Sequence, residues 1–489
     1  MEHIRKIKKS FVYMLLISFM FIYSASAASP KQATTKSLST NYTLVNMSTT
    51  DDATVVVKYL KEDGSNWPAD TANTTFTIGK NFKQKIIAQY FDSTMTNGRG
   101  SAIIQSNTQL GAVVQILARN QTPSSGAYSG ISSPSSSYYV PLVQKKLNTA
   151  SGISNTIIVV QNAEVISQQV TINFIAYPGI GGISNHTKTL NIPPESSSYY
   201  DVTSENLLED GWTGSAVVAA ESGKKVVVVA STFLGPNTMT TYNAFPVEAA
   251  GKNWGIPLFT SRLLNGLNTS VSIQNVSGAA IPANGITLTC KAGSGFSPAT
   301  FTKQNTNPIP NNASFAVNPV VDTSIPGNWS GSCLLNSSGD VVVIVTLRSP
   351  GYNENSGAYE AFNLDTSIDT RVVVPLMSKR QANGFATVAT IQNLDTSNSV
   401  DVKLTYTPSA EYTGSSAPVV LNKTIPAGGN LIQNFRLADG VPEIPDGWFG
   451  TLLVEPVGTP RPIVAFVQLT NILNPQGDTL LTHNAFTLP

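Results

Sequence analysis

Charged residues are scarce in this chain of 489 residues. They make up 12% of it, about half of their share in an average soluble protein. The 30 basic and 29 acidic side chains nearly cancel, and neither sign gathers into a patch or a stripe. Because binding to nucleic acid depends on concentrated positive charge, the composition argues against a nucleic-acid partner.

Histidine is scarcer still, with three in the whole chain. His186 and His483 lie far apart, and His483 stands where related segments carry tyrosine. A nucleophilic triad or a zinc site built on histidine is therefore not expected. The acids Glu209 and Asp210 are adjacent in a polar, loop-like stretch, where solvation explains them better than catalysis. We expect no enzymatic activity, no catalytic or metal site and no cofactor.

Apolar runs long enough to span a membrane are missing. The first 27 residues combine a basic stretch, an apolar run of 13 residues from Phe11 to Tyr23, and the small residues Ala25, Ser26 and Ala27. This order is typical of a secretory signal peptide, and a spanning helix needs roughly 20 apolar residues. We expect cleavage near Ala27 and a secreted or cell-surface protein without a transmembrane segment. An uncleaved membrane anchor is the alternative.

Apolar residues at helical spacing are also missing, since no stretch keeps them at i, i+3, i+4 and i+7 over several turns. The chain is instead rich in Ser, Thr, Asn, Val and Gly, which favour strands and turns. It also repeats itself, because four strand-like segments end on asparagine. These asparagines are 116, 113 and 118 residues apart: Asn46, Asn162, Asn275 and Asn393.

A second landmark has the same period. The segment GWTGSAVVAA (211–220) describes a tight turn with an aromatic residue, followed by an apolar strand, and three related segments occur. We call this recurring turn the corner. Its glycines are 114, 117 and 119 residues apart: Gly100, Gly214, Gly331 and Gly450.

The corner also carries a tryptophan in three of its four copies: Trp212, Trp329 and Trp448, with Arg99 taken as the corresponding residue of the first copy. Two roles are open for these residues. They form either a plug that closes one end of a domain or an exposed platform that stacks on sugars. A tryptophan beside a glycine turn favours the plug.

Each copy also contains a strand that alternates apolar and other residues, such as Val170, Ile172 and Phe174. Such alternation indicates a strand with one face in a core. A repeat of about 116 residues is long enough to bury its own core. The sequence therefore predicts an all-β chain of four tandem, antiparallel, immunoglobulin-like β-sandwich domains, arranged like beads in a row. The expected boundaries are 1–27 for the signal peptide and 28–137, 138–251, 252–371 and 372–489 for the four units.

The chain has two cysteines, and both fall in the third unit. Cys290 takes the place of an aromatic residue in the other units, and Cys333 takes the place of an alanine or a leucine. In a secreted protein such a pair predicts a disulfide, with two buried free thiols as the alternative. Closing a loop of about 44 residues would stabilise the unit by roughly 4 kcal/mol.

In its repeated short strands, its export signal and its loops rich in Ser, Thr and Asn, the chain resembles bacterial surface proteins built of tandem immunoglobulin-like sandwiches. The resemblance covers all four units, but none of them has the Cys…Trp…Cys spacing of antibody domains. It implies a structural or adhesive surface protein, either a spacer or a subunit of an extracellular filament or surface layer. Its partners would be further copies of itself or other surface proteins and glycans. A carbohydrate-binding array is the alternative function.

The first unit departs from the others at its start. The later units open with an apolar segment that contains Pro-Leu, such as YYVPLV (138–143), whereas the first has the polar stretch from Ala28 to Thr40. One hypothesis is an open sheet edge that accepts a strand from a neighbouring subunit near Ala28 to Thr40 and so builds filaments. The alternative is a diverged first strand with a flexible terminus.

Overall fold

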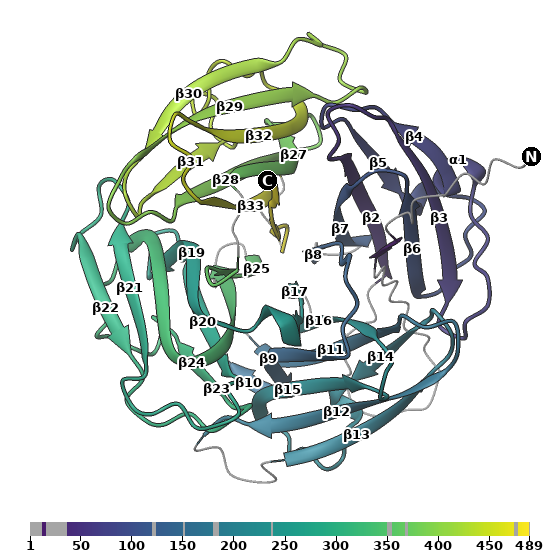
Figure 1. Cartoon of the computed structure of the whole chain (residues 1–489), viewed down its shortest axis with the longest axis vertical. Coiled ribbons are helices and arrows are strands. Elements are labelled where there is room, and N and C mark those ends of the chain that lie inside the picture. Colours follow the sequence, from purple (N-terminus) through teal and green to yellow (C-terminus); the bar gives the residue numbers. More distant parts are fainter. Residues whose placement is uncertain are drawn as a thin grey trace, which may run out of the picture.

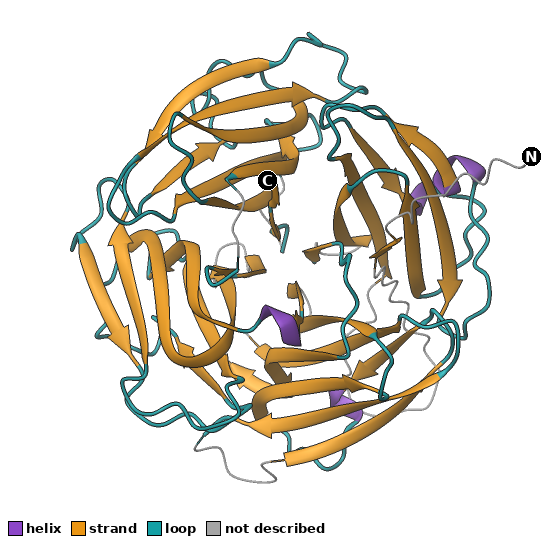
Figure 2. Cartoon of the chain, in the orientation of Figure 1, coloured by secondary structure: helices purple, strands orange, loops and turns teal. Residues whose placement is uncertain are grey.

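The computed structural model describes residues 12–15, 37–119, 124–149, 152–178, 185–235, 238–349, 355–366, 370–473 and 478–488. Nearly every described element is an antiparallel strand, and the short helices lie in connections (Figure 2). The predicted all-β fold of several sandwiches is confirmed. Within the described ranges, no helix has the length and apolar character needed to cross a bilayer.

The four units stand around a common axis and close into a ring (Figure 1). The fourth unit packs against the first through a shared apolar cluster that includes Val45 and Val373. The expected row of beads is therefore wrong, because neighbouring units share apolar contacts instead of being held apart by linkers. The innermost strand of each unit lies at the axis: β8 (Ser125–Ser129), β17 (Thr238–Asn243), β25 (Asn355–Glu360) and β34 (Leu481–Asn484).

In the first unit the outer sheet has the order β1-β6-β3-β4 and the inner sheet the order β5-β2-β7-β8. The remaining elements are β1 (Val12–Leu15), β2 (Ser37–Asn46), β3 (Ala53–Lys61), α1 (Thr71–Thr74), β4 (Thr75–Ile78), β5 (Gln84–Ala88), η1 (Gln89–Phe91), β6 (Gly100–Ser106) and β7 (Leu110–Arg119).

The second unit has the outer order β13-β12-β15-β9-β18 and the inner order β10-β11-β16-β17, with β14 paired to β11. Its remaining elements are β9 (Ser137–Lys145), β10 (Leu147–Thr149), β11 (Gly152–Asn162), β12 (Gln168–Ala176), β13 (Asn185–Ile192), β14 (Ser197–Asp201), η2 (Val202–Ser204), β15 (Trp212–Ala220), β16 (Val226–Leu234), β18 (Phe245–Pro246) and η3 (Val247–Ala249).

In the third unit one long strand, β24 (Trp329–Ser349), belongs to both sheets. Its first half lies in the outer order β22-β21-β24-β19-β26, and its second half pairs with β20 and β25. The other strands are β19 (Gly251–Ser261), β20 (Asn268–Asn275), β21 (Ile286–Ala292), β22 (Thr300–Gln304), β23 (Ser314–Val317) and β26 (Phe362–Asn363).

The fourth unit has the outer order β30-β29-β32-β27-β35 and the inner order β31-β28-β33-β34. Its remaining strands are β27 (Arg371–Ser378), β28 (Phe385–Asn393), β29 (Val400–Pro408), β30 (Val419–Ile425), β31 (Asn430–Asn434), β32 (Phe449–Val457), β33 (Ile463–Asn471) and β35 (Phe486–Leu488).

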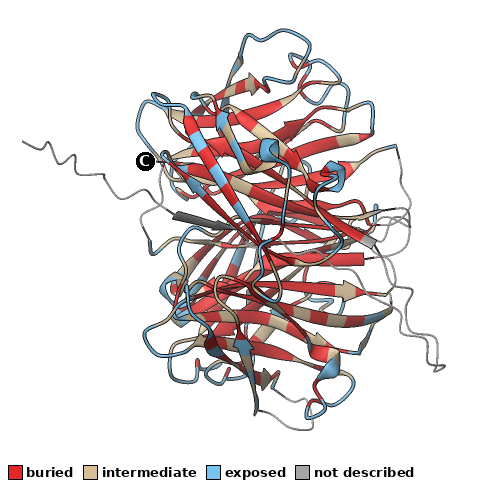
Figure 3. Ribbon diagram, turned by 90° about the vertical axis from the view of Figure 1, so that its right-hand side faces the viewer, coloured by how far each residue is buried: buried red, intermediate tan, exposed pale blue. Residues whose placement is uncertain are grey.

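Burial follows the period of two along the outer sheets. On β3, β12, β21 and β29 alternate side chains are buried, as the sequence pattern predicted. Val170, Ile172 and Phe174 are all 0% exposed. In a side view, buried residues fill the strands and many exposed residues lie in the outer loops (Figure 3).

The repeating asparagines are buried ties inside each unit. Asn162 Nδ2 donates to Ile192 O at the end of the outer sheet (3.1 Å), and its Oδ1 accepts the backbone N–H of Glu164 (2.8 Å). Because a satisfied buried amide fixes how the two sheets meet, the residue recurs once per unit. Asn46, Asn275 and Asn393 make the same two kinds of hydrogen bond.

Glycines allow neighbouring units to approach closely. A Cβ on Gly111 of the first unit would lie 2.8 Å from the ring of Phe486 in the fourth unit. A Cβ on Gly357 of the third unit would lie 2.5 Å from Thr482 of the fourth. Neither glycine has a positive φ, so close packing is what requires it.

We predict that Gly111→Ala lowers the free energy of unfolding by about 1–3 kcal/mol and loosens the joint between the first and fourth units, because the added methyl group overpacks it. Gly79→Ala is the control, since a Cβ there meets its nearest atom, in Lys83, at an ordinary 3.6 Å. Denaturant unfolding measures the stability, and small-angle X-ray scattering measures the size of the ring. Equal effects of the two substitutions would speak against the closed ring.

Candidate functional site

The corner places a glycine where two strands nearly touch. A Cβ on Gly214 would lie 2.1 Å from the carbonyl oxygen of Ile175 on the neighbouring strand. Glycine recurs here because any side chain would collide with this oxygen. The corresponding distances are 1.9 Å for Gly100 to Leu60 O, 2.0 Å for Gly331 to Lys291 O and 2.1 Å for Gly450 to Thr407 O.

The residue that follows each corner glycine joins its unit to the next. In all four units it is a serine or a threonine whose hydroxyl donates to a backbone carbonyl of the following unit, and the fourth unit returns to the first. We call these contacts the joint bonds. They run from Ser101 to Glu195 O (3.0 Å), from Ser215 to Asn312 O (2.6 Å), from Ser332 to Gly428 O (2.9 Å) and from Thr451 to Phe82 O (3.1 Å).

The corner tryptophans are buried inside their units. Trp212, Trp329 and Trp448 are at most 2% exposed. Trp212 packs edge-to-face on Phe174 with ring centroids 6.0 Å apart, and Trp448 packs in the same way on Tyr406. A ring that is buried to this extent does not stack on a sugar, so these residues form plugs and not a carbohydrate platform.

In the first unit the tryptophan comes from elsewhere in the chain. Counted from the corner glycine, the tryptophan place falls on Gly98 and not on Arg99, which corrects the sequence comparison. A Cβ on Gly98 would lie 3.3 Å from the ring of Trp67, which is 3% exposed. Trp67 therefore fills the end of this unit. Arg99 pairs with Glu62 and lies over the ring of Tyr199 in the second unit.

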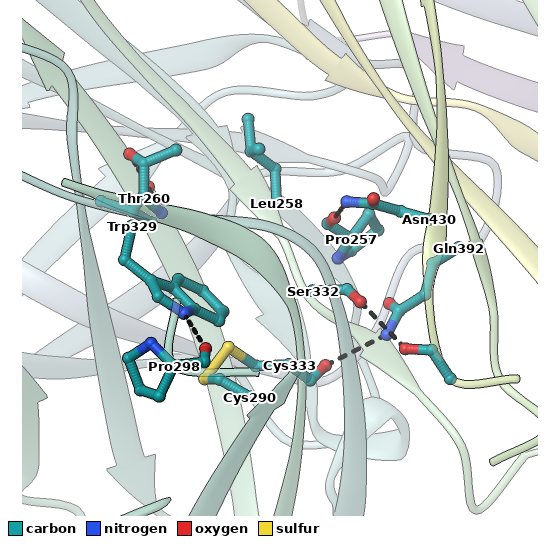
Figure 4. Close-up of a disulfide and its surroundings, with 12 residues drawn as sticks. Pro257, Leu258, Thr260, Cys290, Pro298, Trp329, Ser332, Cys333, Gln392 and Asn430 are labelled. Carbon is teal, nitrogen blue, oxygen red and sulfur yellow. Dashed lines mark hydrogen bonds between the residues drawn. A yellow bond between two sulfur atoms is a disulfide. The ribbon is translucent and has the colours of Figure 1, made fainter. Parts of the chain in front are cut away.

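Cys290 and Cys333 face each other across β21 and β24 and form a disulfide with an S–S distance of 1.99 Å (Figure 4). In the second unit the same cross-strand pair is Phe174 opposite Ala216. The disulfide lies beside the joint with the fourth unit, where Gln392 Nε2 donates to Cys333 O (3.3 Å). It is thus a local crosslink in the core of the third unit.

At the axis, the last residue of each innermost strand contacts its neighbours. These residues are Ser129, Asn243, Glu360 and Asn484. Asn243 Nδ2 donates to Ser129 O (2.9 Å), and the backbone N–H of Asn243 donates to the Glu360 carboxyl group (2.7 Å). Asn484 Nδ2 donates to Glu360 O (2.7 Å). Burial raises the pKa of the Glu360 carboxyl group to about 7.

His483 is a structural residue of the fourth unit. It is 3% exposed, and burial lowers its pKa to about 4. It stands in the place of Tyr242 and Tyr359, whose hydroxyls donate to Leu142 O (2.8 Å) and Leu258 O (2.6 Å). These carbonyls belong to β9 and β19, so the tyrosines tie the axis to the first strand of their own units.

His186 lies in the second unit, with 3.1 Å between its Nε2 and Glu205 Oε2. Burial alone would raise the pKa of Glu205, but hydrogen bonds from Tyr200, from the backbone of Leu207 and from His186 lower it to about 2. The two histidines that follow the predicted signal peptide thus belong to separate packing contacts.

Each later unit begins with a strand that we call the entry strand, namely β9, β19 and β27. It pairs with the corner strand, and its Pro-Leu step falls where the register shifts. In β9 the side chains of Tyr138, Val140 and Val143 are all 0% exposed. In the first unit β1 takes this place beside β6, with Leu15 opposite Ala102.

The polar stretch from Ala28 to Thr40 is only partly a tail. Ala28 lies outside the described residues. Ser37 begins β2, and Thr40 is paired with Ile116 and 0% exposed. The expectation of a polar tail as far as Thr40 is therefore wrong, because the inner sheet already begins at Ser37.

A cavity of about 490 Å³ lies between the second and third units. Aliphatic side chains and hydroxyl groups line it, among them Leu142, Tyr177, Thr240 and Val320. The described lining residues include no carboxylate and no imidazole, so the cavity does not supply a general acid or base from those groups.

Comparisons with known proteins give no family for the chain. No family model matches the sequence, and no curated protein is significantly similar to it. A crystal structure from Thermotoga maritima is 14% identical, over 24% of this chain and 97% of its own, with a TM-score of 0.20. The major pilin of Streptococcus pyogenes, in a mutant form, is 7% identical, over 72% of this chain and 98% of its own, with a TM-score of 0.13. Neither TM-score is high enough to establish a shared fold.

Replacing Trp212 with alanine should lower the free energy of unfolding by about 3–5 kcal/mol, because it removes a buried aromatic plug. The control is Phe91→Ala, whose side chain is 76% exposed and whose loss should change stability little. Urea unfolding measures both variants, and a glycan array tests binding. Loss of glycan binding by Trp212→Ala without loss of stability would restore the carbohydrate platform.

The Glu360 carboxyl group should make the protein less stable as the pH rises. Its pKa is raised from 4.5 to about 7, so the folded chain holds a proton that the unfolded chain has already released. This contribution is full below pH 4.5 and is lost as the pH rises through about 7, at a cost of at most about 3 kcal/mol.

Glu360→Gln keeps the shape of the protonated side chain and should remove this part of the pH dependence. Glu209→Gln is the matched control, because Glu209 is exposed. Thermal unfolding between about pH 5 and pH 8 measures the slope. A slope that Glu360→Gln leaves unchanged would show that the carboxyl group at the axis does not titrate as described.

Proposed function

We propose that this chain is an exported structural or adhesive protein of a cell surface or extracellular layer, that it is not an enzyme, and that the closed ring is its working form. The observation that carries the proposal is the cycle of joint bonds, in which the fourth unit returns from Thr451 to Phe82 of the first. A chain closed on itself in this way has a fixed shape and little freedom between units, as suits a building element.

The chemistry of the recurring residues supports the same function. The corner glycines, the tryptophans and the asparagines all take part in packing or in internal hydrogen bonds. Motifs that recur once per unit therefore account for the architecture and do not build a reaction centre. The described geometry gives us no reason to assign a substrate.

Export is supported by the first 27 residues and by the crosslink in the third unit. Disulfides persist in oxidising compartments outside the cytoplasm, and the bond between Cys290 and Cys333 fits such a location. Assembly into a filament or a layer would use the edge of β6 in the first unit, where the strand β1 comes from the predicted signal peptide.

Cell fractionation, surface protease treatment and N-terminal sequencing test the proposal together. We expect the protein outside the cytoplasm, starting near Ala28. The double variant Ala25→Leu, Ala27→Leu should keep its leader, because it removes the small residues of the cleavage site. Recovery of the unaltered protein in the cytoplasm with residues 1–27 intact would overturn the proposal.

A further inference from the structure

The outer sheet of the first unit is completed by a segment that export would remove. In the later units the corner strand pairs with an entry strand of the same unit. In the first unit its partner is β1, residues 12–15, which lie inside the predicted signal peptide. Cleavage near Ala27 would therefore take away the strand that β6 pairs with.

A buried hydroxyl marks the same gap from the axis. Tyr128 is 1% exposed, and its hydroxyl has no hydrogen-bond partner. Tyr242 and Tyr359 stand in the same place in the next two units and donate to the leucine carbonyl of the Pro-Leu step, Leu142 O and Leu258 O. Because a buried hydroxyl without a partner is costly, Tyr128 indicates where a strand carbonyl belongs.

A second buried hydroxyl marks the gap from the neighbouring unit. Ser197 pairs with Gln161 on the inner sheet of the second unit, is 0% exposed and also lacks a hydrogen-bond partner. Ser314 and Asn430 hold the same register position in the later units. They donate to the proline carbonyl of the preceding unit's entry strand: Ser314 Oγ to Pro141 O (2.8 Å) and Asn430 Nδ2 to Pro257 O (3.0 Å, Figure 4).

The two hydroxyls define the register of one missing strand. In the second unit the carbonyls of Pro141 and Leu142 are consecutive, and one faces the neighbouring unit while the other faces the axis. A strand laid beside β6 in the same register would present two consecutive carbonyls to Ser197 and Tyr128. Its side chains would also have to be apolar at the places of Tyr138, Val140 and Val143, which are buried in the second unit.

We propose that β6 of the exported protein is an acceptor site for one extended strand of another exported polypeptide, with the pattern apolar, any residue, apolar, Pro, Leu, apolar. The proposal rests on the proposed export, since removal of the leader opens the site. A second copy of this chain does not fit as the donor, because its three strands of this pattern are paired within their own units. Binding is β-augmentation, in which the backbone gives affinity and the alternating side chains give specificity.

The test uses the mature chain, residues 28–489, and a fluorescent peptide with the sequence of β9, SYYVPLVQK (137–145). We expect saturable binding by fluorescence anisotropy and none with a scrambled peptide. Tyr128→Phe should weaken binding about 2- to 10-fold, since it removes one hydrogen bond and keeps the ring. The matched control, Tyr242→Phe, changes the same position in a unit that already has its strand and should leave the affinity unchanged.

A second construction tests the same site without a free peptide. The mature chain carrying residues 137–145 and a flexible linker at its N-terminus should melt at a higher temperature and no longer bind the peptide. If the mature chain alone is unfolded, the β9 peptide and not the scrambled one should restore protection of residues 100–106 from hydrogen exchange. Failure to restore it would overturn the proposal.

Three further outcomes would overturn it as well. One is an exported mature chain that binds no peptide and already protects residues 100–106. Another is self-association that competes with the peptide, which would make a second copy the occupant. The third is equal binding by the wild type and the Tyr128→Phe variant. In an exported protein these results remove the strand-acceptor site alone, whereas a cytoplasmic protein with an intact leader removes the proposed function itself.

Discussion

The ring depends on one kind of hydrogen bond, made by the hydroxyl next to each corner glycine. A single such bond contributes about 0.5–1.5 kcal/mol net, which is too little to hold two domains together. Its weight lies in the surroundings, because Ser101 and Ser215 are almost fully buried and each would be a costly unpaired donor without the next unit. Burial of apolar surface brings the units together, and the hydroxyls fix the position in which they meet.

The corner therefore joins two requirements in two consecutive residues. The glycine lets the neighbouring strand pass at a distance that no Cβ permits, and the next residue reaches across to another unit. A substitution at either position affects a different level of the structure, the sandwich in one case and the ring in the other. This explains why the segment recurs with little variation in a chain whose loops vary freely.

The sequence predicts the units well and the ring poorly. The period, the alternation on β12 and the cross-strand place of Cys290 and Cys333 follow from local spacing, which a strand pair translates directly into structure. Contacts between units carry no period of their own, and Ser215 looks in the sequence like an ordinary turn residue. One signal was present: the continuous apolar runs of β16 and β33 have both faces buried, which an isolated sandwich would not require of an inner strand. The misplacement of Arg99 has a simpler reason, since Trp67 reaches the corner from a distant part of the unit and leaves no trace in the repeat.

The first unit differs from its siblings at each point where it meets the ring. Val45 stands where Gln161, Gln274 and Gln392 stand, and it packs in the apolar cluster that closes the ring. An apolar closing joint makes no demand for a particular carbonyl, so the last joint tolerates the small misfits that accumulate over four units. The same unit lacks an entry strand after its leader is removed, although Tyr128 and Ser197 keep the donors that such a strand satisfies. A strand lost by simple divergence would leave no pressure to keep two buried hydroxyls in register, because apolar replacements of the same shape would be more stable. Their retention is the physical reason to regard the edge of β6 as a place that is filled in the working protein.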